Sequence, residues 1–96
     1  MDVMYVISSR NVALLLLPLL RACKRRGTAW GCFFTDSGVE VLDDERVRGL
    51  LSCATDAVAC EYSWERYRHG RECPVQTGSQ TNHSAMAAEA THIVSL

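Results

Sequence analysis

The sequence lacks an excess of charge of either sign. Its 96 residues include ten lysines and arginines against eleven aspartates and glutamates, which leaves a formal net charge of −1 at pH 7. This balance provides no overall field that would hold a polyanion, so we expect no nucleic-acid partner. The one dense basic run, residues 24–26, follows an apolar segment, where cations complement the carbonyl end of a helix.

The sequence also lacks the close ligand pairs that mark zinc sites and the motifs that mark nucleotide sites. No CxxC pair, GxGxxG stretch or Walker loop is present, so we expect no metal and no cofactor. The cysteine count is odd, which argues against a secreted disulfide framework and favours reduced thiols in a cytoplasm. The five cysteines are Cys23, Cys32, Cys53, Cys60 and Cys73.

No hydrophobic run is long enough to cross a bilayer. The main apolar stretch, Val12 to Leu20, is interrupted by Pro18. With Arg10 before it and Cys23 after it, this stretch superficially resembles a signal peptide that ends in a lipoprotein cleavage site. However, a second apolar run, Val3 to Ile7, precedes the charged residue, so we expect a cytoplasmic protein without a membrane anchor.

What is present is an ordinary globular composition, with 48% hydrophobic and 22% charged residues. A chain of this length is best read as one domain, residues 1–96. Apolar, β-branched runs alternate with helical patterns, which predicts a small α/β domain with an open, mainly parallel five-stranded sheet and helices on both faces.

The expected elements follow from these patterns and from turn and capping residues. Asn11 is expected to cap the first helix and Gly27 to end it, while residues 39–42 favour no particular structure. Residues 61–72 are expected to form a helix or a lid. Strands are expected at residues 3–7, 28–35, 56–60, 74–76 and 92–96, and further helices at residues 12–26, 43–53 and 83–90.

Ligands of open α/β sheets sit beyond the carboxyl ends of the strands. This rule selects Ser8 and Ser9 and the ranges 35–38, 60–63 and 76–82, of which only 60–63 contains a thiol. That thiol, Cys60, ends a strand where free backbone N–H groups of the following helix favour a nucleophilic thiolate. A functional Cys60 and a buried strand-end cysteine are about equally compatible with this position.

The other cysteines have simpler interpretations. Cys23 and Cys53 fall on apolar helix faces and Cys32 falls within a strand, where cysteine packs as a small hydrophobe. Cys73 precedes Pro74 in an expected loop, so it is either an exposed bystander or a second, resolving thiol. His69 and His83 are interpreted as surface polar residues rather than catalytic bases.

Three stretches resemble the DsrE/DsrF-like sulfur-relay family. They are "WGCFFTDSGVEVL", in which an aromatic strand runs into residues 35–38, "VACEYSWERYRHG", with Cys60 followed by Ser63 and Gly70, and "CPVQTGSQTNHSAMAAEATHIVSL", with Gly78 and Ser79 before the last helix. The likeness covers nearly the whole chain. It departs from the family in the acidic and aromatic "EYSWERY" segment after the cysteine.

The resemblance implies a parallel α/β sheet with flavodoxin-like layering and assembly into homo- or hetero-oligomers. In many members a cysteine carries persulfide sulfur between donor and acceptor proteins, and the matching position here is Cys60. Ser63, Gly78 and Ser79 would then hold the thiolate or its terminal sulfur, with Cys73 as a possible second thiol.

Two other functions stay open from the sequence. The chain would be a non-catalytic interaction subunit if the apolar helix of residues 12–23 builds an oligomer and the strand-end pocket binds a small ligand or nothing. It would be a sensor of small anions or nucleotides if the start of the last helix, residues 78–82, binds phosphate compounds.

Overall fold

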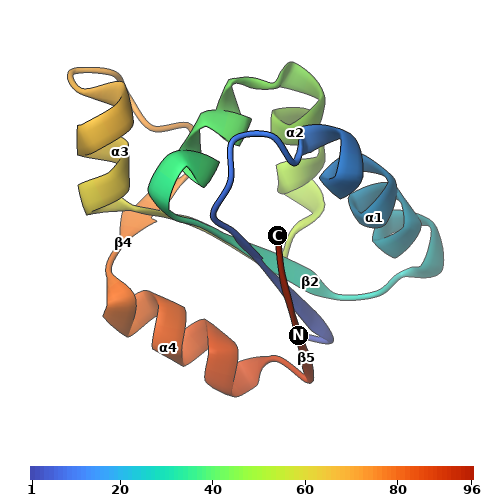
Figure 1. The fold of residues 1–96 in the computed structure, drawn as a ribbon. Coiled ribbons are helices and arrows are strands. Elements are labelled where there is room, and N and C mark those ends of the chain that lie inside the picture. Colours follow the sequence, from blue (N-terminus) through green and yellow to red (C-terminus); the bar gives the residue numbers. More distant parts are fainter.

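The computed structural model describes all 96 residues and contains one sheet of five parallel strands (Figure 1). The strands are β1 (Val3–Ile7), β2 (Trp30–Phe34), β3 (Asp56–Cys60), β4 (Gln76–Gly78) and β5 (His92–Ser95). The helices are α1 (Ala13–Arg26), α2 (Glu45–Leu50), α3 (Glu61–Arg68) and α4 (Gln80–Glu89), with 3-10 helices η1 (Asp36–Asp43) and η2 (Leu51–Cys53). The predicted fold class is confirmed.

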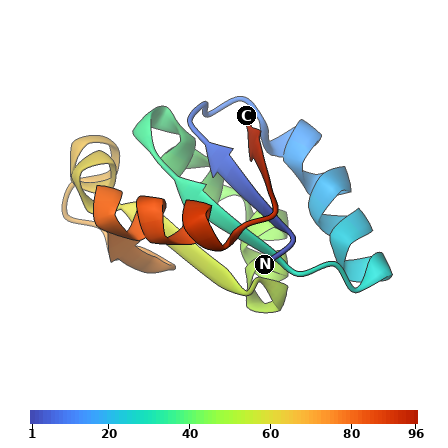
Figure 2. The same ribbon diagram turned by 90° about the horizontal axis from the view of Figure 1, so that it is seen from below.

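The strand order is β4-β3-β2-β1-β5, and it explains where the helices lie. From β1 to β4 the chain moves steadily in one direction, so right-handed connections put α1, α2 and α3 on the same face of the sheet. The step from β4 to β5 runs the other way and puts α4 on the opposite face. Figures 1 and 2 show this division, with α4 alone beneath the sheet.

Two apolar clusters form the core, one on each face of the sheet. The larger one joins α1, η1 and α3 to the sheet through side chains that include Tyr5, Leu16 and Trp30. The smaller one consists of Met4, Phe33, Val58 and Met86 beneath α4. All five residues of β2 are buried, as expected for the middle strand of a parallel sheet with both faces covered.

The boundaries of α1 agree with the prediction at its end but not at its start. Gly27 ends the helix at a φ of 67°, and its N–H donates to the carbonyls of Cys23 and Lys24. Asn11 does not cap the helix; the N-cap is Val12, which has no side-chain acceptor. The N–H of Asn11 donates to Ser9 Oγ at 3.4 Å, and the expected cap lies one residue before the observed one.

The fourth strand lies further along the chain than expected. Residues 74–76 were predicted to form it, but the strand is Gln76–Gly78, paired with Val58, Ala59 and Cys60. Pro74 has no N–H to give to a ladder, which explains the shift. α4 begins at Gln80 rather than at residue 83 because Ser79 and Asn82 form a capping box there.

The other helices also differ in detail from the prediction. Residues 39–42 join the turn before them in one 3-10 helix, η1, and α2 ends at Leu50. Cys53, expected on an apolar face, is exposed because the chain changes from α2 to η2 before reaching it. None of the helices is long and apolar enough to span a membrane.

We predict that Gly38→Ala destabilises the protein. A Cβ at this position would lie 2.1 Å from the carbonyl oxygen of Ile7, so the backbone at the end of β1 would have to move. Overpacking of this kind costs about 1–3 kcal/mol, measurable by urea unfolding.

Gly49→Ala is the matched control, since nothing lies within 4 Å of its added Cβ and it sits inside α2. It should raise the unfolding free energy by about 0.5–1 kcal/mol. Equal stability of the two variants would contradict the tight contact between Gly38 and the end of β1.

Candidate functional site at the carboxyl edge of the sheet

Cys60 lies where β3 gives way to α3, as the last residue of the strand and the N-cap residue of the helix. Its side chain is partly exposed and packs against the smaller core cluster, on the same face as Val58 two residues earlier. No capping hydrogen bond uses its sulfur. The thiol therefore combines an apolar support with access from solvent and with the N-terminus of an eight-residue helix.

Gly78 lies directly beside Cys60 in the parallel pairing of β3 with β4. It is buried, and a Cβ there would lie 2.6 Å from Asn82 Oδ1 and 2.8 Å from Val58 Cγ1. The next residue, Ser79, is exposed, and its hydroxyl accepts the N–H of Thr81 at 3.2 Å. The structure thus brings Gly78 and Ser79 to the same edge as Cys60, as predicted.

The capping box of α4 occupies groups that an anion would need. Asn82 Oδ1 accepts the Ser79 N–H at 2.9 Å, and the Ser79 hydroxyl accepts the N–H of Thr81. These two donors are satisfied within the chain. The geometry therefore weakens the case for an anion sensor at residues 78–82.

Ser63 ties the start of η1 to helix α3. Its side chain is only 3% exposed, and its Oγ accepts the backbone N–H of Asp36 at 2.9 Å. Asp36 has a φ of 49°, and no other non-glycine residue has a positive φ. Ser63 therefore holds the turn after β2 against α3, next to Cys60, and its hydroxyl is engaged in this contact.

Cys73 is separated from Cys60. It precedes β4 at the amino side of the strand, and it packs against the larger core cluster, whereas Cys60 packs against the smaller one. Burial raises the pKa of the Cys73 thiol, while the N–H of Val75 opposes that effect. The structure does not bring the two thiols together as a nucleophile and a resolving partner.

An ion-pair network fastens α3 to η1. Arg68 contacts both Asp43 and Glu40, the latter through Nη1 to Oε1 at 2.8 Å, and Arg10 Nε lies 2.9 Å from Glu40 Oε2. The hydrogen bond from Arg68 lowers the pKa of Asp43. His69 pairs with Glu65 on the exposed side of α3. Arg68 and His69 are thus both engaged by acidic side chains.

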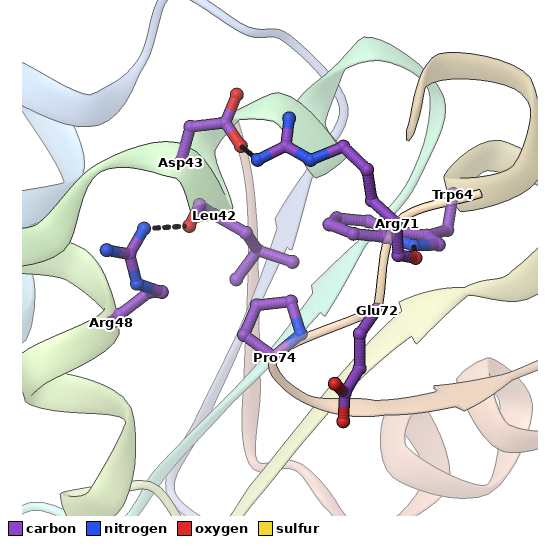
Figure 3. A pocket seen from close by; sticks show the side chains of 7 residues that line it. All are labelled: Leu42, Asp43, Arg48, Trp64, Arg71, Glu72 and Pro74. Atoms are coloured by element: carbon purple, nitrogen blue, oxygen red, sulfur yellow. Dashed lines mark hydrogen bonds and ion pairs between the residues drawn. The ribbon is translucent and has the colours of Figure 1, made fainter. Parts of the chain in front are cut away.

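Two cavities lie away from Cys60, and Figure 3 shows the first of them. The first, of about 230 Å³, has Arg48 and Arg71 on either side, with Arg48 donating to the carbonyl of Leu42 at 2.8 Å. The second, of about 400 Å³, shares Arg48 and Pro74 with the first. Cys60 lines neither cavity, so chemistry at its sulfur would take place on an open surface.

The strand order reverses between β1 and β5, where hydrogen bonds continue beyond the strand ends. Ser8 donates its N–H to the carbonyl of Leu96 at 2.9 Å, and its hydroxyl reaches the same oxygen at 3.3 Å. Open α/β sheets usually bind ligands at such a switch point. Here Cys60 lies two strands away from β1, so the candidate site does not coincide with it.

The remaining thiols and histidines fall as follows. Cys23 and Cys32 are buried, which confirms their assignment to the core, and burial raises the pKa of Cys32 strongly. His83 is partly buried, and its ring meets that of Phe33 edge-on at 5.0 Å, a packing role that the sequence analysis missed. No three potential metal ligands converge in the structure.

Comparison with known proteins adds no relative: no family model, curated protein or solved structure matches this chain.

We predict that Ser63→Ala lowers the free energy of unfolding by about 1–3 kcal/mol, because it leaves the Asp36 N–H without its acceptor. Thermal unfolding of the variant beside Ser84→Ala, an exposed serine on α4, provides the measurement and its control. If both substitutions changed stability equally little, the hydrogen bond from Asp36 would not hold the turn.

Proposed function

We propose that this chain is a small sulfur-relay protein, in which Cys60 accepts sulfane sulfur as a persulfide and passes it to the thiol of a partner. The observation that supports this most is the position of Cys60, partly exposed at the junction of β3 and α3 beside the side-chain-free Gly78. The likeness of the sequence to the DsrE/DsrF-like family points the same way.

The transfer is a thiol exchange at a sulfane sulfur. The Cys60 thiolate attacks the outer sulfur of a donor persulfide, a new S–S bond forms on Cys60, and the donor leaves as a thiolate. The sulfur leaves Cys60 by a second step of the same type. The thiolate of the acceptor protein attacks the outer sulfur, and Cys60 departs as a thiolate. Neither step needs a metal or an external oxidant.

An open site suits this chemistry. A sulfur that passes between two proteins must be reached by a second cysteine, so an enclosed cavity would obstruct the transfer. The N-terminus of α3 lies at Cys60, and the backbone of Gly78 and Ser79 lies beside it at the end of β4. The five cysteines are all free, in keeping with a reducing cytoplasm as the site of action.

We predict that the reduced protein gains the mass of one sulfur atom when it is incubated with inorganic polysulfide, and that Cys60→Ser does not. The variant should fold normally, since serine replaces a partly exposed sulfur. Intact-mass spectrometry measures the gain, and circular dichroism checks the fold.

Cys53→Ser is the matched control, because Cys53 is more exposed than Cys60 but lies outside any strand end. It should load as the unsubstituted protein does. Loading that survives Cys60→Ser, or that is lost in Cys53→Ser, would contradict the proposal.

A second candidate function is a non-catalytic interaction subunit that assembles with a related chain. Its specific support is an apolar surface on α1, where Leu14 is 77% and Leu15 56% exposed. This function does not depend on Cys60, so Cys60→Ser would leave assembly intact. Both functions would place the chain in an oligomer. The charges around the apolar surface of α1 indicate which kind of partner it binds.

A further inference from the structure

The two edges of the sheet differ in how well they are protected. β4, at one edge, has only three residues, follows Pro74 and exposes polar Gln76 and Thr77, all features that discourage pairing with another strand. β5, at the other edge, has the sequence His-Ile-Val-Ser with no proline and no charged residue of fixed sign. Only β5 is therefore open to a further strand.

The backbone of β5 offers hydrogen-bonding groups to such a strand. The N–H groups of His92 and Leu96 donate inward, to the carbonyls of Asp2 and Val6. In a parallel strand alternate residues point to opposite sides, so the N–H and C=O groups of Ile93 and Ser95 point outward. The side chain of Ile93 is 51% exposed, which adds an apolar contact to this row of polar groups.

α1 adds a second part to the same surface. Figures 1 and 2 both show α1 on the β5 side of the molecule, away from α3 and β4, and Figure 2 shows it extending beyond β5. Its exposed residues are apolar in the first half, at Leu14, Leu15 and Pro18. A strand added to β5 would thus meet α1 on one face of the sheet and Ile93, which pairs with Met4 of the smaller cluster, on the other.

The charge of this surface indicates the chemistry of the partner. The second half of α1 exposes four cations that form no ion pair within the chain, and neither α1 nor β5 contains an acidic residue. A second copy docked through the same two elements would bring the same cations and, from α1 and β5, no acid to neutralise them. The four cations are Arg21, Lys24, Arg25 and Arg26.

We propose that β5 and α1 form a docking surface for an extended segment of a different protein that is apolar along its length and acidic at one end. Such a segment adds a sixth strand beside β5, and its acidic end meets the cations at the end of α1. An anionic membrane would satisfy the charges but would leave the outward N–H and C=O groups of Ile93 and Ser95 without partners. The observations therefore favour a peptide strand.

This surface is separate from the candidate sulfur site. β2 and β1 lie between β3 and β5, so Cys60 is about 14 Å from the open edge at the usual spacing of strands. A partner held at β5 leaves the thiol free to react. Binding at the docking surface and sulfur loading at Cys60 are therefore independent, and failure of one test leaves the other proposal intact.

The test uses a short synthetic peptide that begins with aspartates and glutamates and continues with alternating valine and threonine. A second peptide with lysines in place of the acids is the probe control. In a parallel arrangement the acidic end lies at the amino end of β5, where α1 ends. Fluorescence anisotropy should show saturable, salt-dependent binding of the acidic peptide and much weaker binding of the lysine peptide.

Two variants test the basic and the strand-pairing parts of the surface separately. The first variant reverses the charge at the end of α1 by Lys24→Glu, Arg25→Glu and Arg26→Glu together. It should bind the acidic peptide roughly tenfold more weakly, which is the combined effect of three exposed ion pairs. Ile93→Lys should abolish binding, because a charge on the edge strand discourages pairing. Tyr62→Lys is the matched control, since Tyr62 is an exposed apolar residue on α3, far from β5.

Failure of the acidic peptide to bind, equal binding of the lysine peptide, or full binding to Ile93→Lys would each overturn the proposal. So would sedimentation of the protein as a dimer that Ile93→Lys makes monomeric, which would assign the surface to a second copy. Binding to phosphatidylserine vesicles without binding to the acidic peptide would assign it to a membrane and overturn it equally.

Discussion

The parallel pairing of β1 with β2 is the constraint on which the rest of the structure depends. β2 is buried along its whole length, and it pairs with β1 on one side and β3 on the other. Because every strand of the sheet runs the same way, all the carboxyl ends meet at one edge. The segments that follow β2 and β3, η1 and α3, are therefore neighbours, and the hydrogen bond from Asp36 to Ser63 joins them.

The reversal of strand order after β4 has a second consequence. It places three helices on one face and only α4 on the other, and it makes β5 the edge strand beside β1. Cys60 packs on the face that α4 covers. β4 and β5 are the two edge strands, at opposite sides of the sheet. The helix that covers the face of Cys60 and the open edge at β5 thus both follow from this single reversal of strand order.

Strongly patterned elements were predictable from the sequence. β1 and β3 have the bounds that their short apolar runs indicated, and Gly27 ends α1 as its freedom to adopt a positive φ suggests. Helix starts were less predictable because several residues compete to be the cap. Asn11 and Val12 compete at α1, and the paired side chains of Ser79 and Asn82 start α4 early.

The candidate site was predictable in part. The rule that ligands meet strand ends brought Cys60, Gly78 and Ser79 together correctly, since parallel register alone aligns them. It did not indicate that Ser63 would be engaged by Asp36, or that Cys73 would pack on another cluster. The hydrogen bond depends on two residues distant in sequence, and the packing of Cys73 depends on which face its loop covers. A local sequence pattern contains neither kind of information.

Exposure and position in the fold predict opposite orders of reactivity for Cys53 and Cys60. Cys53 is the more exposed thiol, whereas Cys60 has the strand end, the helix N-terminus and the apolar support. The most direct measurement is therefore a brief alkylation of the native protein with limiting iodoacetamide, followed by peptide mass mapping of each cysteine. The account predicts that Cys60 is labelled faster than Cys53, because Cys60 lies at the N-terminus of α3 whereas Cys53 ends η2. Faster labelling of Cys53 would show that exposure alone sets the order, and would contradict a working sulfur at Cys60.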